Sequence, residues 1–251
     1  MTEIHDGVFV LQDRNVFVYL VRDGDEGLLI DAGFAETARM LLPRLAALGV
    51  RRLSRVLLTH GHGDHYEGAP EVVRAVSAEV CIHPADAALV AENGDYPLMR
   101  DLSVRYPGLF SVPAKHEPLG LRLRPIAEGD RIAVGSRSLR VLHTPGHSAG
   151  SSCFLDEERG LLFSGDAVSG DFVHFYCEPA TLDSSLARLE RERFDHLLMA
   201  HPYPPENANA LAGARARGFL AHSRDAVSRA RARVAERRRA EPAVTAQALA
   251  E

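Results

Sequence analysis

Hydrophobic positions along the chain follow two different periods, which alternate. Short apolar runs rich in β-branched and aromatic residues, bounded by Gly, Asp or Asn, predict strands. Stretches with an apolar residue at every third or fourth position predict helices. In the first third of the chain the predicted strands are residues 7–10, 15–21, 27–31, 55–59 and 79–83. The predicted helices are residues 35–48, 68–77 and 84–92.

The same alternation returns after an irregular stretch. Prolines and glycines interrupt every period over residues 93–120, which predicts a lid-like excursion or a variable surface loop. Strands are predicted at residues 130–134, 138–143, 151–155, 160–164 and 195–200, with a helix over 181–193 opened by Thr181 and Asp183. Helices are predicted over 206–239, and residues 241–251 form a frayed tail. We therefore expect one domain over residues 1–240.

Two parts of the chain are similar to each other. Gly27-Leu-Leu-Ile-Asp31 has a counterpart in Gly160-Leu-Leu-Phe-Ser-Gly-Asp166, and each of two predicted strands ends close to a histidine, His60 or His201. Similar units at similar offsets indicate two related αβ halves, because a solenoid needs shorter and more numerous repeats.

Composition narrows the class of protein. The 251 residues are 46% hydrophobic and 25% charged, with a net charge of −5, so the chain carries no basic field for nucleic acid. No apolar run is long enough to cross a membrane, and the N-terminus has no secretory leader pattern. Cys81, Cys153 and Cys177 form no paired motif, which favours a reducing compartment. These features predict a cytoplasmic domain of enzyme size, with monomer or homodimer left open.

The densest chemical motif is His60-Gly-His62-Gly-Asp64-His65, directly after a predicted buried strand. Imidazole and carboxylate are the ligands that suit zinc and its first-row neighbours. The intervening glycines let the backbone fold tightly around one point. The motif therefore predicts a metal site.

Six neighbouring residues cannot fill two coordination shells, so further ligands are expected elsewhere. His147 lies in a turn shaped by Pro145 and Gly146, Asp166 follows the strand 160–164, and His201 follows the strand 195–200. Ligand sites in α/β sheets tend to lie just past the carboxyl ends of strands. Each residue alone could be a turn or capping residue, but together with the first motif they predict a shared centre.

The motif order from Asp31 to His201 resembles the metallo-β-lactamase-fold hydrolases, and the TPGHxxG and GD motifs resemble their glyoxalase II-like branch. The resemblance implies a four-layer αββα sandwich of two similar halves. It also implies two metal sites, one held by His60, His62 and His147, the other by Asp64, His65 and His201, with Asp166 bridging both. Asp31 is implied to shape the loop or to orient a ligand rather than to bind a metal.

Such a centre predicts hydrolysis. The expected cofactors are two divalent ions, zinc first, with iron or manganese also suited to the ligand set. Metal binding lowers the pKa of water to about 7, so a bridging hydroxide is the expected nucleophile. Asp64 is expected to orient that hydroxide and later move its proton.

Site details narrow the reaction. His62 departs from the diiron branch of the family and Asp166 departs from true β-lactam hydrolases, which leaves hydrolysis of a small acyl substrate, thioester first. A lactone or other ester is the alternative, and Ser169 stands where lactonases often have Tyr. A phosphodiesterase and a non-catalytic metal-binding sensor are further alternatives. His174, Tyr176 and Tyr203 are candidates to line the substrate pocket, although each could equally be a packed or turn residue.

Overall fold

A computed structural model describes residues 1–92, 104, 118–173 and 178–240. The first sheet contains β1 (Thr2–His5), β2 (Val8–Asp13), β3 (Val16–Asp23), β4 (Glu26–Ile30), β5 (Arg52–Leu57), β6 (Glu79–Ile82) and β7 (Leu123–Pro125), in that order. Its strands are antiparallel from β1 to β4 and parallel from β4 to β7. This half therefore starts as a meander and continues with strands linked by helices.

The second sheet contains β8 (Arg131–Val134), β9 (Arg137–His143), β10 (Ser152–Asp156), β11 (Leu161–Phe163), β12 (His196–Leu198) and β13 (Ala210–Ala212). Its order is β13-β12-β11-β10-β9-β8, and its strands are antiparallel except for the parallel pair β11 and β12. The helices are α1 (Ala35–Ala47), α2 (Gly63–Tyr66), α3 (Ala69–Val76), α4 (Pro84–Ala91), α6 (Pro179–Leu189) and α7 (Gly213–Ala240).

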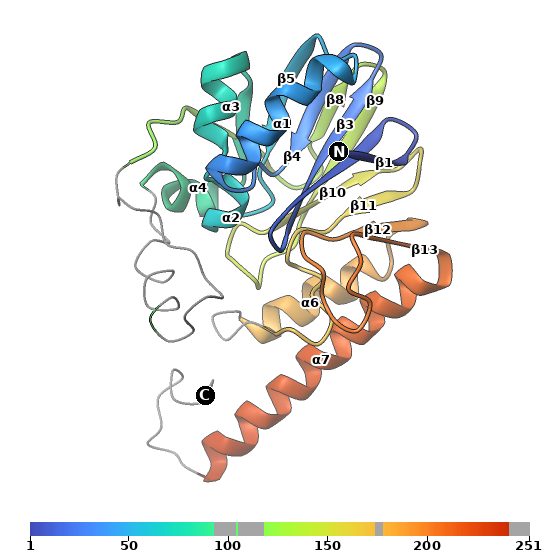
Figure 1. Ribbon diagram of the computed structural model, residues 1–251. Helices are drawn as coiled ribbons and strands as arrows, with labels where there is room; N and C mark the ends of the chain where they lie inside the picture. The colour runs from blue at the N-terminus through green and yellow to red at the C-terminus, as the bar shows by residue number, and fades with distance from the viewer. Residues whose placement is uncertain (93–103, 105–117, 174–177, 241–251) are drawn as a thin grey trace.

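Strand periodicity divides the buried side chains among three apolar cores. Along β2, Val8 and Val10 face the space between the sheets, whereas Phe9 faces outward onto the core that α1 and α3 cover. Along β10, Phe154 faces the inner core and Leu155 faces the outer core covered by α6 and α7. Three cores separate four layers, with helices on both outer faces of the paired sheets (Figure 1). The predicted αββα sandwich is confirmed.

Several elements differ from the sequence prediction. The strands β1, β7 and β13 and the short helix α2 were not expected, because runs of three or four residues carry too few periods to be recognised. The predicted helices over 206–239 are β13 followed by the single helix α7, whose distal part extends beyond the body (Figure 1). Helix α6 begins at Pro179 rather than Thr181, since the Glu178 side chain accepts the Thr181 N–H and caps it. The excursion 93–120 and the tail 241–251 lie largely outside the described residues.

The carboxyl ends of the central strands meet at one edge of the sandwich. The parallel strands β4, β5 and β6 end there in the first sheet, and β9, β11 and β12 end there in the second. Two backbone hydrogen bonds join the halves at this edge, from the Ser152 N–H to the Thr59 carbonyl and from the Phe17 N–H to the Ala200 carbonyl. The loops that leave these strands therefore converge.

The opposite ends of β9 and β10 contain a buried ion pair. The Arg137 guanidinium donates to the Asp156 carboxylate at 2.8 and 3.1 Å, and it also donates to the carbonyls of Asp6 and Arg22 in the other half. Both side chains are 1% exposed. This pair joins the two sheets at the end of the sandwich away from the converging loops.

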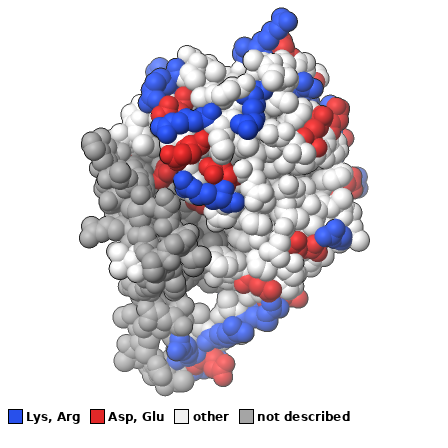
Figure 2. All heavy atoms as spheres, viewed as in Figure 1, with Lys and Arg blue, Asp and Glu red and all other residues white. Residues whose placement is uncertain are grey.

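The outer surface over α1 and α3 mixes both signs of charge. Arg39 lies within ion-pair distance of Glu36 and Glu71, and Arg74 pairs with Glu71. Figure 2 shows basic and acidic side chains interspersed on this face of the molecule. Within the described residues, no helix combines the length and the apolar character that a membrane span requires.

Candidate metal centre

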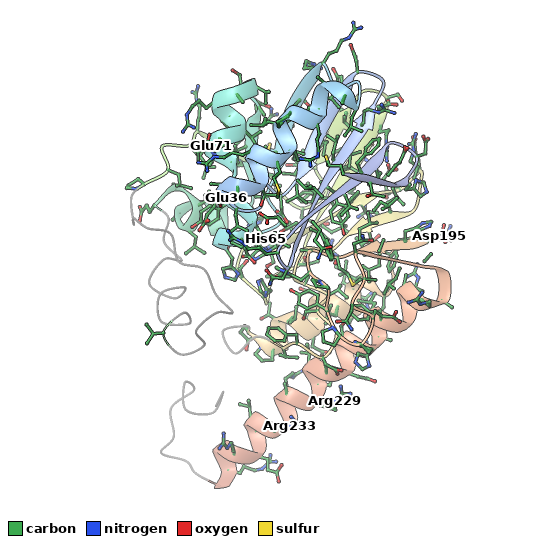
Figure 3. The ribbon with its side chains drawn as sticks, in the orientation of Figure 1. Glu36, His65, Glu71, Asp195, Arg229 and Arg233 are labelled. Atoms are coloured by element: carbon green, nitrogen blue, oxygen red, sulfur yellow. The ribbon has the colours of Figure 1, made fainter. Side chains whose placement is uncertain are left out.

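All seven residues predicted as metal ligands come together at the edge where the strands end. The loop after β5 contributes His60, His62, Asp64 and His65, and the loops after β9, β11 and β12 contribute His147, Asp166 and His201. Figure 3 labels His65 between the helices of the first half and the elements below them. Six of the seven are buried, and Asp64 is partly exposed. Residues up to 141 positions apart therefore form one cluster.

Three imidazoles form the first group of ligand atoms. The His60 Nε2, His62 Nδ1 and His147 Nε2 atoms lie 2.9 to 3.1 Å from one another. Three ring nitrogens that all point at one another cannot be satisfied by hydrogen bonds among themselves alone. Ligand atoms of the three residues that the family resemblance assigns to one metal thus surround a single point.

Asp64, His65 and His201 form the second group. The His201 Nε2 atom lies 3.3 Å from the His65 Nε2 and 3.3 Å from one Asp64 oxygen. The His65 Nε2 atom lies 3.6 Å from the other Asp64 oxygen. This group is the second predicted metal set.

Asp166 directs one oxygen toward each group. Its Oδ1 lies 3.4 Å from the His201 Nε2 and 3.6 Å from the His65 Nε2, whereas its Oδ2 lies 3.5 Å from the His147 Nε2. The buried Oδ1 accepts no hydrogen bond of acceptable geometry from the described part of the chain. The carboxylate is therefore placed as a bridge between the two groups.

Hydrogen bonds on the far side of two rings fix their orientation. Asp31 Oδ2 accepts from the His65 Nδ1 at 2.8 Å, and the Asn15 carbonyl accepts from the His201 Nδ1 at 2.6 Å. Both rings consequently present Nε2 to the centre. Asp31 also accepts two hydrogen bonds from Thr59. It holds a left-handed backbone conformation at φ 62°, a strain that the surrounding bonds must offset.

Burial and neighbouring charges shift the pKa values of several residues in the cluster. Burial and the neighbouring imidazoles keep the pKa of His60 well below its usual value. Burial alone would lower the pKa of His65, but Asp64, Asp166 and Asp31 raise it to about 10. Burial works against ionisation of Asp166, yet His201 and His65 hold the pKa of its carboxyl well below the usual range. Neighbouring imidazoles in one cluster thus have pKa values shifted in opposite directions.

The donor set fits two first-row divalent cations. A tetrahedral ion with bonds of 2.0–2.1 Å keeps its ligands about 3.3 Å apart, close to the spacing of the ring nitrogens. A cation in each group would also give the buried Asp166 Oδ1 a partner and remove the conflict among facing imidazoles. Histidine and carboxylate ligands suit zinc, iron and manganese.

Of the three residues predicted to line the substrate pocket, the structure describes only Tyr203. His174 and Tyr176 lie outside the described residues. Tyr203 is buried, and its ring lies against His201 with centroids 5.4 Å apart and stacks on Phe172 at 6.3 Å. Phe172 is 50% exposed. Sequence analysis did not single out Phe172, because a lone aromatic residue has no distinguishing pattern.

The positioning contacts of Asn15 and Thr59 were also missed. Asn15 acts through its backbone carbonyl, so its side chain leaves no signal in the sequence. Thr59 directly precedes His60, and its place at the end of a buried strand could have suggested the contact with Asp31.

A family model described as the metallo-beta-lactamase superfamily matches residues 11–202. An acyl-coenzyme A thioesterase, MBLAC2, of Gallus gallus is 35% identical over 181 residues, which cover 64% of this chain and 63% of that protein. An atrochrysone carboxyl ACP thioesterase of Aspergillus fumigatus is 35% identical over 164 residues, 64% of this chain and 31% of that protein. The matched part thus spans less than two thirds of each relative's length.

Solved structures show the same fold. A metallo-beta-lactamase of Cronobacter sakazakii, a variant in its HARLDQ motif, superimposes with a TM-score of 0.73 at 22% identity over 96% of this chain and 98% of that one. A subclass B3 metallo-beta-lactamase of Bradyrhizobium japonicum gives a TM-score of 0.66 at 21% identity over 95% and 94% of the two chains.

Proposed function

The chain belongs to the metallo-β-lactamase superfamily, and on this premise we propose that it is a metal-dependent hydrolase of small acyl thioesters. The observation that carries the proposal is the convergence of the two ligand groups on Asp166, which directs one oxygen to each. Relatives named as an acyl-coenzyme A thioesterase and an atrochrysone carboxyl ACP thioesterase support the substrate class.

Seven side chains would hold two divalent ions. His60, His62 and His147 would hold one, Asp64, His65 and His201 the other, and Asp166 would contact both. When bound, the ions would act as Lewis acids on the thioester carbonyl and lower the pKa of water at the centre. Asp31 and the Asn15 carbonyl hold the His65 and His201 rings in the orientation that this binding needs.

Asp64 is the carboxylate best placed to move a proton. Its side chain is 20% exposed, against 5% for Asp166, so it lies at the open side of the centre. We assign its carboxylate oxygens the task of orienting the attacking water, accepting a proton from it and passing that proton to the leaving group or to solvent.

A thioester suits a site with this proton chemistry. Cleavage releases a thiolate, and a thiol with a pKa near 8.5 departs without full protonation in the transition state. An alkoxide from an ester or lactone is far more basic and demands stronger acid assistance. Ser169, which stands at the position expected of a lactonase Tyr, directs its hydroxyl to the Phe172 carbonyl at 2.8 Å.

We assign the Phe172 and Tyr203 rings to the wall that contacts the acyl or thiol portion of the substrate. Tyr203 lies directly against the His201 ring, and the half-exposed Phe172 continues the apolar surface outward. A surface of this kind would bind an alkyl or acyl chain by apolar burial.

A substrate panel with two variants tests the proposal. The zinc-loaded protein is assayed with an acyl-CoA, S-lactoylglutathione, a homoserine lactone, a chromogenic cephalosporin and a phosphodiester. We expect the thioesters to be hydrolysed with the highest kcat/KM. Asp64→Asn should lower kcat by about 10²–10⁴-fold, the range for loss of a proton-transfer group. Asp195→Asn is the matched control, because Asp195 is exposed at the far end of the strand that leads to His201 (Figure 3).

Other outcomes would replace the proposal with a named alternative. Preference for the lactone would make the protein a lactonase, and hydrolysis of the phosphodiester alone would make it a phosphodiesterase. Inactivity on the whole panel with both metal sites filled would favour a metal-binding sensor.

A further inference from the structure

A buried carboxylate outside the predicted ligand set joins the two loops that carry the first ligand group. Asp86 lies in the first turn of α4, and its residue is 0% exposed. Its Oδ2 accepts from the Gly61 N–H at 2.9 Å and from the Ser148 hydroxyl at 2.6 Å, and its Oδ1 accepts from the Gly150 N–H at 2.7 Å. Asp86 therefore contacts both loops at once.

Each donor is a neighbour of a predicted ligand. Gly61 lies between His60 and His62, and Ser148 directly follows His147. A second contact supports the same loop, since Ser151 accepts the Ser148 N–H at 3.0 Å. The three imidazoles of the first group thus stand on backbone that is fixed to one carboxylate.

The Asp86 side chain lies close to the backbone of the two glycines that donate hydrogen bonds to it. A Cβ at Gly150 would lie 2.6 Å from the Asp86 Cγ, and a Cβ at Gly61 would lie 3.2 Å from the Asp86 Cβ. Both distances are too short for an unadjusted side chain, so glycine at these positions permits the carboxylate to reach the backbone. The contact accounts for one glycine in each of the two metal motifs.

Asp86 is not neutralised in the way that Asp156 is. In the part of the chain that the structure describes, no lysine or arginine forms an ion pair with Asp86, whereas Asp156 pairs with Arg137. A buried charge without a counter-ion is costly unless hydrogen bonds or nearby cations stabilise it. The loops that Asp86 binds carry His60, His62 and His147, so cations held by these imidazoles would lie on the same backbone segments.

From these contacts we propose that Asp86 is a positioning residue that sets the spacing of His60, His62 and His147 and favours a cation among them. It plays for the first ligand group the part that Asp31 plays for the second. Asp31 acts through a ring nitrogen of His65, whereas Asp86 acts through backbone N–H groups and a hydroxyl. The inference rests on the proposed metal-dependent function.

Metal titration tests the inference without any substrate. Asp86→Asn keeps the shape but removes the charge and places an amide nitrogen among hydrogen-bond donors. We expect one of two zinc ions to bind about 10–100-fold more weakly, the range for outer partners of metal ligands. Competition with a chromogenic chelator measures the affinity, and the visible spectrum of the Co²⁺-loaded protein should change with it.

Two further variants separate positioning from folding. Ser148→Ala removes one of the three hydrogen bonds, so we expect a smaller loss of affinity in a protein that folds normally. Asp156→Asn removes an equally buried carboxylate far from the loops, and it should lower thermal stability without changing metal affinity. Unchanged affinity for both ions in Asp86→Asn and Ser148→Ala would overturn the inference. A protein that binds two ions but cleaves no thioester would overturn the proposed substrate and leave Asp86 to be judged by these titrations.

Discussion

The two ends of the sandwich both contain buried charge but satisfy it in opposite ways. At one end, Arg137 and Asp156 neutralise each other, and the remaining guanidinium hydrogens reach carbonyls of the other half. At the other end, imidazole nitrogens face one another at 2.9–3.3 Å, and the buried Asp166 Oδ1 accepts no hydrogen bond from the described residues. The first arrangement is satisfied by groups of the chain itself, whereas the second presents a donor set that the proposed cations would complete.

This contrast separates the groups that join the two halves of the fold from those that we propose bind metal. In a buried ion pair whose hydrogen bonds are all made within the chain, removing one partner destabilises the fold. Such a pair offers no free donor or acceptor atoms to a ligand. A cluster that binds metal in the folded chain alone, as proposed for the histidine end, is stabilised by that binding. Variants at the two ends should therefore change different measurements.

The largest effect is expected at the bridge between the ligand groups. Asp166→Ala removes a ligand from both, so we expect kcat/KM to fall more than about 1,000-fold, since outer partners alone account for 10–100-fold in metal affinity or activity. Metal content, measured by inductively coupled plasma mass spectrometry, should fall below two ions per chain. Far-UV circular dichroism should remain native, and a variant with full metal content and full activity would contradict the assignment.

At the opposite end, Asp156→Asn should reduce stability and leave chemistry unchanged. Removing one partner of a buried pair leaves an uncompensated charge, which costs about 3–5 kcal/mol in the free energy of unfolding. Urea denaturation of the metal-free protein measures the loss. The kcat/KM per folded, metal-loaded molecule should equal that of the native chain.

The double variant Arg137→Met/Asp156→Leu sharpens this result. Replacing both partners with apolar groups of similar volume is often neutral, so most of the lost stability should return. If the double variant were as unstable as Asp156→Asn, the carbonyl contacts of Arg137 would outweigh the ion pair.

The end that contains the histidine cluster should respond to pH. The carboxylates around His65 raise its pKa to about 10 in the metal-free chain, above the usual value of 6.5. Its protonation therefore stabilises the metal-free fold fully below pH 6.5, and this contribution disappears as the pH rises through 10. Metal must displace the same proton, and, despite burial, the pKa of His201 in the same group is also raised by Asp166 and Asp64. Affinity at the second group should therefore increase at least about tenfold per pH unit below 10.

Chelator competition between pH 6.5 and 8.5 measures this dependence, and thermal unfolding of the metal-free chain measures the opposite trend in stability. A metal affinity that does not change with pH would show that His65 carries no proton in the free chain.

The sequence predicted the centre more completely than it predicted the frame around it. His60, His62 and His147 were recognisable because ligand chemistry restricts residue type and because strand ends restrict position. Asp86 was missed because a single Asp in the first turn of a helix is usual as a partner of the helix dipole. Arg137 and Asp156 lie 19 positions apart on neighbouring strands, and no local pattern marks a pair whose burial depends on how two sheets pack. Strands of three or four residues, such as β7 and β13, were not predicted because they are too short to show a hydrophobic period.

The smallest effect is expected for an ion pair with the same closest nitrogen–oxygen distance that lies on the surface. Arg124 and Glu79 join the neighbouring strands β7 and β6 at 2.8 Å, the distance of the Arg137–Asp156 pair, but their side chains are 54% and 52% exposed. Water solvates both charges after either partner is removed, so Arg124→Ala should cost less than about 1 kcal/mol. Denaturation at low and high salt measures the difference. A loss as large as that of Asp156→Asn would mean that distance, rather than burial, determines the value of an ion pair in this fold.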